Sequence, residues 1–241
     1  MRESVRMSLP SRIAGLDWDR LIQEIDVNGW ATTGPLLSGK ERRALAEAYD
    51  DDCLFRSRVV MARHGFGRGE YRYFAYPLPP LVQQLRTSLY AGLAPLANRW
   101  RASLGLADPF PASFEEYIVR CHKAGQVRPT PLLLRYGPSD YNCLHQDLYG
   151  ELNFPLQAAF LLSEPGSDFI GGELVLTEQR PRMQSRVQVV PLAAGEAAIF
   201  AVNHRPVQGT RGTYRVTMRH GVSPLREGRR HTLGIILHDA A

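Results

Sequence analysis

Two histidines and one aspartate in the C-terminal half have the residue types and spacing of a metal site. His145 and Asp147 stand two positions apart, so in an extended strand both side chains project from the same face. His220, far along the chain, could reach the same point from another strand. Two imidazoles and one carboxylate leave three positions of an octahedral ion open, which is the facial triad of non-haem iron(II) oxygenases. The sequence therefore predicts an iron site.

An arginine and a hydroxyl follow the distal histidine at a spacing that suits anion binding. Arg230 comes ten residues after His220, and Thr232 comes two residues after Arg230, so these two side chains share one strand face. A guanidinium beside a hydroxyl binds a carboxylate through charge-assisted hydrogen bonds. We expect Arg230 and Thr232 to hold the remote carboxylate of a dicarboxylic acid whose other end chelates the metal.

His204 is the alternative distal ligand. It follows the segment GEAAIFAVN, and Arg211 stands seven residues later as its candidate anion-binding partner. Arg211 lies in a Gly-Thr-Arg-Gly-Thr segment typical of a turn, whereas His220 belongs to a strand pattern with its arginine in place. We therefore favour His220 as the ligand and keep His204 as a candidate substrate contact.

Two weaker motifs predict no chemistry. The segment from Gly34 to Lys40 has the glycine and lysine spacing of a phosphate-binding loop, but Glu41 stands where that loop needs a Ser or Thr for magnesium. The residues before it do not form a convincing strand pattern. Cys143 stands two positions before His145, which permits a nucleophilic pair, although a packed cysteine is commoner.

Short apolar runs separated by Gly, Pro, Asp and Ser turns fill the C-terminal half. Several short strands at such spacing are typical of an all-β sandwich or barrel. The runs are 132–136, 156–162, 173–176, 187–190, 197–202, 214–218 and 233–237.

The first 125 or so residues are expected to be mainly helical. Ser38 and Glu41 have capping-box spacing, and Pro80 opens a long helix that Pro95 should kink or break. Helices followed by strands favour an α+β fold. Because no linker separates the halves, we predict one domain, with residues 1–125 as a helical support that does not fold alone and residues 126–241 as the catalytic core.

Composition indicates an ordinary globular protein of 241 residues, with 44% hydrophobic and 22% charged residues. No apolar run approaches the ~20 residues of a membrane span, and the N-terminal residues lack an apolar signal region. The three cysteines are scattered and form no CxxC pair. We expect a cytoplasmic protein without a membrane partner.

Several motifs together resemble the iron(II)/2-oxoglutarate-dependent dioxygenases over residues 132–238. They are RYGPSDYNCLHQD, GGEL, GEAAIF, HGV and GRRHT. The segments EYRYFAYPLP and RRHTLGIILHDA are more particularly similar to a bacterial family of AlkB-like nucleic-acid oxygenases.

The resemblance implies a double-stranded β-helix, which is a distorted jelly roll, with an N-terminal helical layer. It implies iron(II) at the His-Asp-His triad, 2-oxoglutarate at Arg230 and Thr232, and dioxygen as the oxidant. Tyr136 matches a position whose side chain often reaches the oxoglutarate or the metal-bound water. The implied activity is the oxidative demethylation of N-methylated nucleic acid.

Two alternatives to nucleic-acid demethylation stay open. An arginine ten residues after the distal histidine is nearer the prolyl-hydroxylase pattern than the AlkB-type pattern, which favours a hydroxylase of prolyl or other amino-acid side chains. A cupin-like jelly roll that binds a metal or ligand without turnover is the other alternative, but such a protein has no need of Arg230.

Charge and aromatic residues predict a route for a polyanionic strand. The net charge is +5, and six arginines lie on either side of His220 in the sequence: Arg205, Arg211, Arg215, Arg219, Arg226 and Arg229. We expect them to form an electropositive approach to the site. The aromatic run from Tyr71 to Tyr76 could stack an extruded base or simply cover the barrel.

Overall fold

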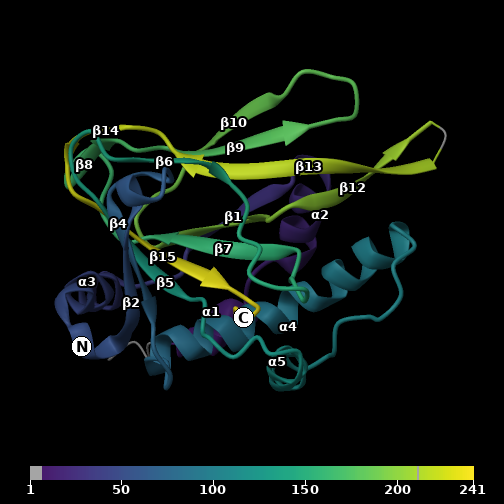
Figure 1. The fold of residues 1–241 in the computed structure, drawn as a ribbon, viewed down its shortest axis with the longest axis horizontal. Coiled ribbons are helices and arrows are strands. Elements are labelled where there is room, and N and C mark those ends of the chain that lie inside the picture. Colours follow the sequence, from purple (N-terminus) through teal and green to yellow (C-terminus); the bar gives the residue numbers. More distant parts are fainter. Residues whose placement is uncertain (1–6, 211) are drawn as a thin grey trace, which may run out of the picture.

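Two antiparallel β-sheets face each other, and helices cover the outer face of the larger sheet (Figure 1). The computed structural model describes residues 7–210 and 212–241. The larger sheet has seven strands in the order β1 (Trp30–Pro35), β11 (Glu196–Ala201), β7 (Leu156–Leu161), β15 (Arg230–Ile236), β5 (Leu132–Tyr136), β4 (Glu70–Phe74) and β2 (Phe55–Val60).

The second sheet has six strands. Five follow the order β10 (Arg186–Val190), β9 (Leu174–Gln179), β13 (Gly212–Val222), β6 (Tyr141–His145) and β3 (Gly67–Arg68), and β12 (His204–Gly209) also pairs with β13. A separate pair, β14 (Leu225–Gly228) with β8 (Phe169–Gly171), closes one end. Facing antiparallel sheets of this kind form a jelly roll, and the predicted α+β double-stranded β-helix is confirmed.

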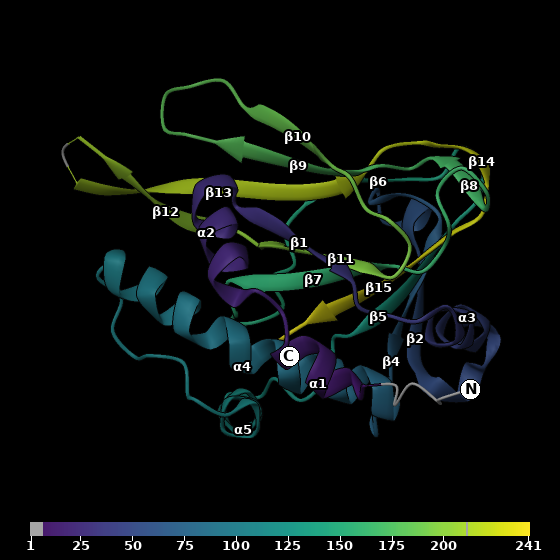
Figure 2. The same cartoon turned by 180° about the vertical axis from the view of Figure 1, so that it is seen from behind.

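The helices lie mainly on one side of the seven-stranded sheet (Figure 2). They are α1 (Leu9–Ala14), α2 (Trp18–Asn28), α3 (Gly39–Glu47), α4 (Pro80–Ser103) and α5 (Phe114–Lys123), with short 3-10 turns at η1 (Ala48–Asp50), η2 (Asp52–Leu54) and η3 (Met61–Arg63). α1 packs on α4, and α2 packs on β1. Within the described ranges, no helix is both long and apolar enough to cross a membrane.

Side-chain alternation along β15 divides the protein into a core and a site. Leu233 and Ile235 point into the main hydrophobic cluster, which also holds the buried leucines of α4. Arg230, Thr232 and Gly234 point the other way, into the cavity between the sheets. Because successive residues of a strand face opposite sides, one strand both packs against the helices and supplies the site.

The predicted start of α3 is confirmed by its capping contacts, and α4 begins at Pro80 as predicted. The Ser38 side chain accepts a hydrogen bond from the Glu41 backbone, and the Glu41 carboxylate in turn accepts one from the Ser38 backbone. These side-chain contacts therefore satisfy the free backbone groups at the start of α3. The segment with phosphate-loop spacing, Gly34 to Lys40, overlaps this helix start. Pro95 lies inside α4 without ending it. Of the predicted kink or break, the break does not occur, because the buried leucines of α4 hold the helix against the core on both sides of the proline.

Residues 1–125 are mainly helical, as expected, but they also contain strands that the sequence analysis did not predict. This region also supplies β1, β2, β3 and β4, including the Trp30–Pro35 strand that the sequence pattern did not support. β1 pairs with β11, and β4 pairs with β5, so both halves of the chain share one sheet. β1, β3 and β4 gain hydrogen bonds from β11, β6 and β5, which lie far along the chain and which local propensity does not register. That the first 125 residues do not fold alone stays a prediction.

Candidate active site

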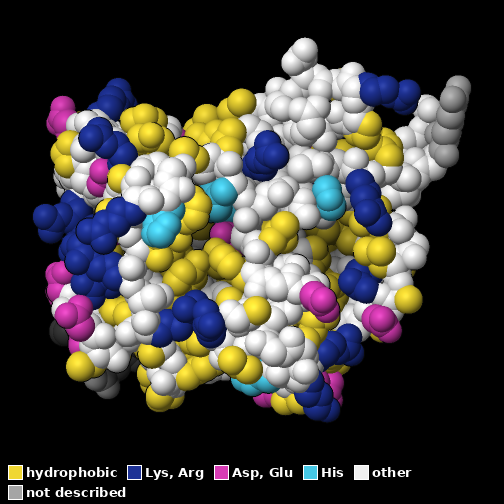
Figure 3. Space-filling view, in the orientation of Figure 1, with side chains coloured by type: hydrophobic (Ala, Val, Ile, Leu, Met, Phe, Trp, Pro, Cys, Tyr) yellow, Lys and Arg dark blue, Asp and Glu magenta, His cyan; other side chains and the backbone are white. Residues whose placement is uncertain are grey.

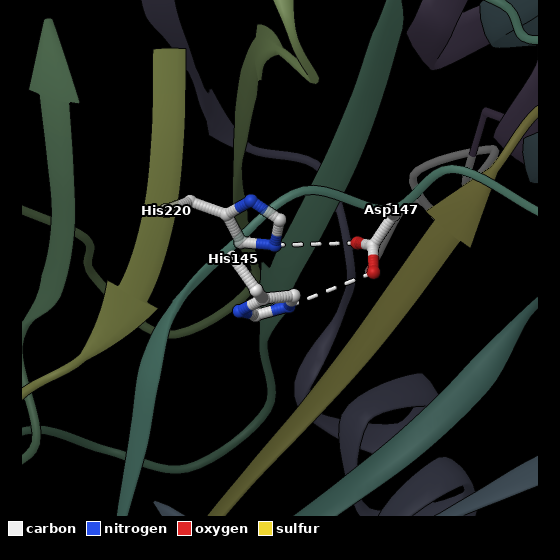
Figure 4. A group of neighbouring side chains, drawn as sticks. All are labelled: His145, Asp147 and His220. Atoms are coloured by element: carbon white, nitrogen blue, oxygen red, sulfur yellow. Dashed lines mark ion pairs between the residues drawn. The ribbon is translucent and has the colours of Figure 1, made fainter. Parts of the chain in front are cut away.

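His145, Asp147 and His220 meet between the two sheets (Figure 4). His145 ends β6 and lies directly opposite His220 of β13 in the strand register. His145 Nε2 lies 3.5 Å from Asp147 Oδ1, and His220 Nε2 lies 3.2 Å from Asp147 Oδ2. Potential ligand atoms of all three residues lie within 4.8 Å of one another. This donor set and spacing fit a single divalent metal ion.

A backbone contact orients the His145 ring. His145 Nδ1 lies 2.8 Å from the Cys143 carbonyl oxygen, and because a carbonyl only accepts, Nδ1 must be the donor. The neutral ring then has its lone pair on Nε2, on the side of Asp147. Burial, followed by the charge of His220, lowers the pKa of His145 and favours this neutral form. Cys143 thus contacts His145 through its backbone and not its thiol.

Two side chains that the sequence analysis did not single out hold the Asp147 carboxylate. The Tyr149 hydroxyl donates to Asp147 Oδ1 at 2.7 Å, and the Gln157 amide donates to Oδ2 at 2.8 Å. Tyr73 donates to the Tyr149 hydroxyl at 2.9 Å. Burial alone would raise the pKa of Asp147, but the hydrogen bond and charge of His220, with the Tyr149 hydroxyl, hold it well below its usual range.

The sequence contains a weak signal for each of the two residues that the sequence analysis missed, Tyr149 and Gln157. Tyr149 continues the two-residue period of His145 and Asp147, although it lies beyond β6. Gln157 is the lone amide in the otherwise apolar strand LQAAFL, where a buried polar group needs a hydrogen-bonding partner.

Replacing Tyr149 by phenylalanine should weaken metal binding without unfolding the protein. The variant removes only the hydroxyl that fixes Asp147 Oδ1, and loss of such an outer partner lowers metal affinity by roughly 10- to 100-fold. Titration with Mn(II) or Co(II) measures this effect directly. Tyr90→Phe, which removes a hydroxyl bonded to the Pro111 carbonyl away from the site, is the matched control. Equal metal affinities in both variants would contradict the assigned role of Tyr149.

The predicted anion-binding pair lines the same cavity as the triad. Arg230 is buried, and its Nη1 donates to Thr232 Oγ1 at 2.6 Å. Its guanidinium carbon lies 5.6 Å from the centre of the Tyr136 ring. Among the described residues, no carboxylate forms an ion pair with Arg230. Burial lowers the pKa of this guanidinium because it disfavours the charged form, and since an arginine stays charged in proteins, a bound anion would offset this cost.

The cavity has a volume of about 340 Å³, and its wall includes both the triad and Arg230. Four buried polar atoms in this wall have no hydrogen-bond partner within the described part of the chain: Tyr136 Oη, Gln157 Oε1, His220 Nδ1 and Arg230 Nε. Buried polar atoms without partners indicate a place for a polar ligand. A metal ion with a small dicarboxylate therefore fits these residues. Figure 3 shows histidine side chains beside the hollow at the centre of this face and an acidic side chain within it.

The structure does not bring His204 to the triad. His204 begins β12 and lies opposite Thr217, and its side chain does not contribute to the cavity wall. The cluster of potential metal ligands found among the described residues contains His220 instead. The geometry thus favours His220 over His204 as the distal ligand.

The predicted arginine approach needs one correction. Arg205 is buried, and it donates hydrogen bonds to the Asp26 carbonyl oxygen at 2.8 Å and to the Glu178 carboxylate. It cannot serve as a surface cation, because α2 and β9 supply its partners. The other described arginines of the group are exposed: Arg215, Arg219, Arg226 and Arg229. Arg211 lies outside the described residues.

The four aromatic residues between Tyr71 and Tyr76 lie in four different environments. Tyr71 lines the cavity, and Tyr73 joins the hydrogen-bond chain to Asp147. Phe74 belongs to the main hydrophobic core. The Tyr76 hydroxyl donates to Asp239 at 2.9 Å, away from the cavity. Of this run, only Tyr71 is therefore placed to contact a ligand in the cavity.

Sequence comparison identifies the family. The family model Oxygenase-NA, described as an oxygenase catalysing oxidative methylation of damaged DNA, matches residues 69–240, which is more than two thirds of the chain. The uncharacterised protein Rv2227 of Mycobacterium tuberculosis strain H37Rv is 47% identical over 168 residues, covering 70% of this chain and 72% of that protein.

Solved structures of low sequence identity share the fold. A prolyl 4-hydroxylase from Phytophthora capsici has a TM-score of 0.55 at 15% identity and covers 99% of this chain and 68% of its own. A prolyl hydroxylase from Trichoplax adhaerens, solved with a hypoxia-inducible-factor peptide fragment, has a TM-score of 0.53 at 12% identity. The match covers 97% of this chain and 92% of that chain. With the family match, the jelly-roll fold and the His-Asp-His cluster together, the chain belongs to the Oxygenase-NA family and is an iron(II)- and 2-oxoglutarate-dependent dioxygenase.

Proposed function

We propose that this enzyme oxidatively removes N-methyl groups from damaged nucleic acid. The observation that carries the proposal is a single cavity whose wall contains the triad at one place and the buried Arg230 guanidinium at another. The family description, which names damaged DNA, supports the substrate class. We take the oxidised group to be a methyl already present on the base, because an oxygenase inserts oxygen into a C–H bond.

In this proposal His145 and His220 bind iron(II) through Nε2, and Asp147 binds it through a carboxylate oxygen. Bound iron(II) and 2-oxoglutarate supply the activation of dioxygen for hydroxylating a C–H bond. The protein fixes the geometry: Tyr149 and Gln157 hold the carboxylate, and the Cys143 carbonyl holds one imidazole.

In the same cavity, Arg230 and Thr232 would bind the remote carboxylate of 2-oxoglutarate. Arg230 supplies the charge, and Thr232 supplies a hydroxyl that already contacts the guanidinium. Tyr136 is buried beside them, and its hydroxyl has no partner among the described residues, so it can donate a third hydrogen bond. The buried setting excludes water and strengthens each charge-assisted contact.

Hydroxylation of an N-methyl group gives an N-hydroxymethyl group, which releases formaldehyde and leaves N–H on the base. Asp147 and His220 are both buried, so a base within a duplex cannot reach them without leaving its stack. Exposed arginines near His220 in the sequence would bind the flanking phosphates.

A substrate panel tests the proposed activity. N-methylated single-stranded DNA, duplex DNA and RNA are incubated with iron(II) and 2-oxoglutarate, and released formaldehyde, lost methyl mass and succinate are measured together. The expected result is demethylation coupled one-to-one to succinate formation. A proline-containing peptide is the comparison, and succinate coupled to peptide hydroxylation with no change in any nucleic acid would replace this proposal with the amino-acid hydroxylase.

Nucleic-acid binding should weaken steeply with salt. Each phosphate contact contributes about −0.9 to the slope of log affinity against log salt concentration for duplex DNA. The double substitution Arg219→Ala with Arg226→Ala should therefore make the slope about two less negative, as measured by fluorescence anisotropy at several salt concentrations. Replacing Arg20, which pairs with Glu24 on α2 away from the cavity, should leave the slope unchanged. An unaltered slope in the double variant would remove these arginines from the binding surface.

A further inference from the structure

A glycine-rich loop, residues 63–69 with the sequence Arg-His-Gly-Phe-Gly-Arg-Gly, presents an aromatic ring at the mouth of the cavity. Phe66 lines the cavity although 47% of its surface is exposed, which is unusual for so large an apolar side chain. Its ring stacks on His64 with the centroids 5.3 Å apart and the planes 24° from parallel. The proposed chemistry assigns no role to Phe66 or His64.

The loop is held in place by its backbone. Cys143 N donates to the Phe66 carbonyl oxygen at 2.9 Å, and Gly67 pairs with Asn142 where β3 meets β6. Gly67 has a φ of 128°, and a Cβ there would collide with the Tyr141 carbonyl oxygen. Only glycine therefore permits this close approach. The exposed position of Phe66 is consequently fixed by the strand that carries His145.

A second exposed apolar side chain lies on the same rim. Leu144, immediately before His145, lines the cavity and is also 47% exposed. Arg63 and Arg68 flank the ring pair in the sequence, are exposed, and form no ion pair with any residue in the described ranges. Hydrophobic side chains border the hollow in Figure 3, with basic side chains to its left. An apolar rim beside unpaired positive charge suits a strand of stacked bases with phosphates at its edge.

We propose that Phe66 is a wedge that enters a duplex in place of the base taken into the cavity, with Leu144 supporting it. This inference rests on the proposed demethylase function and adds a substrate class, duplex DNA. Apolar side chains inserted between base steps compensate for the stacking lost when a base is extruded. In this proposal Arg63 and Arg68 bind the phosphates on either side of the extruded base. His64 backs the Phe66 ring, so the wedge keeps its orientation.

The test compares Phe66→Ala with Phe66→Leu on one methylated sequence, offered as a duplex and as a single strand. Loss of a stacking side chain should lower the ratio of duplex to single-strand turnover by about tenfold to a hundredfold in Phe66→Ala. Phe66→Leu keeps an apolar wedge and should recover most of that ratio. Val187→Ala, an exposed apolar residue of β10 that does not line the cavity, should keep the wild-type ratio.

A binding measurement separates extrusion from turnover. With 2-aminopurine beside the methylated base, wild-type protein should raise the fluorescence of the duplex, and Phe66→Ala should raise it much less. An unchanged turnover ratio with an unchanged fluorescence response overturns the wedge, as does a wild-type enzyme that demethylates single strands alone. If the wild type demethylates no nucleic acid, the proposed function itself fails, which is a different result from a wild-type duplex activity that ignores Phe66.

Discussion

His220→Ala should abolish turnover and remove most of the metal affinity, whereas His204→Ala should retain both. His220 lies opposite His145 in the β13–β6 register, and its Nε2 lies 3.2 Å from Asp147. Losing one of three ligands should lower metal affinity by more than the 10- to 100-fold that loss of an outer hydrogen-bonding partner produces. Equilibrium titration with Mn(II) or Co(II) measures affinity independently of turnover.

The two histidines form a matched pair for this experiment. His204 is also on a strand of the six-stranded sheet, but it lies opposite Thr217 and outside the cavity wall. A melting curve for each variant establishes that both are folded. If His204→Ala loses the metal while His220→Ala keeps it, the ligand assignment is wrong.

Arg230→Ala should raise the 2-oxoglutarate concentration needed for half-maximal turnover by about tenfold to a hundredfold. A hydrogen bond to a charged group contributes about 1.5–3 kcal/mol, which converts to that range of affinity. The metal affinity should change little, because Arg230 does not contact the triad. Direct titration of the metal-loaded protein with 2-oxoglutarate gives the same comparison without turnover.

The melting temperature of an Arg230 variant tests the same assignment independently of turnover. Arg230 is buried with one side-chain hydrogen bond, to Thr232, and no carboxylate partner among the described residues. Burying a charge without an opposite charge is unfavourable, so Arg230→Met should not lower the Tm measured without 2-oxoglutarate. Added 2-oxoglutarate should then raise the Tm of the wild type more than that of Arg230→Met. An unchanged oxoglutarate requirement in Arg230→Ala would refute the assignment.

The sequence by itself determined two pairs of candidate site residues, one at and just after the end of β6 and one in β15. His145 with Asp147, and Arg230 with Thr232, stand two positions apart, and alternation along an extended chain puts each pair on one side. Local rules also determined the start of α3, where Ser38 and Glu41 satisfy the exposed backbone groups of the helix. These features depend on a few neighbouring residues, so the order of residues is enough to predict them.

Only the tertiary structure decided features that depend on distant partners. The strand from Trp30 to Pro35 exists because β11 offers it hydrogen bonds, and Arg205 is buried because Glu178 and the end of α2 receive its guanidinium. The hydrogen bonds of Tyr149 and Gln157 to Asp147, like the choice of His220, follow from the arrangement of the two sheets. Residues far apart in sequence meet only after the sheets face each other, and no local pattern encodes which of several polar side chains will then lie within hydrogen-bonding distance.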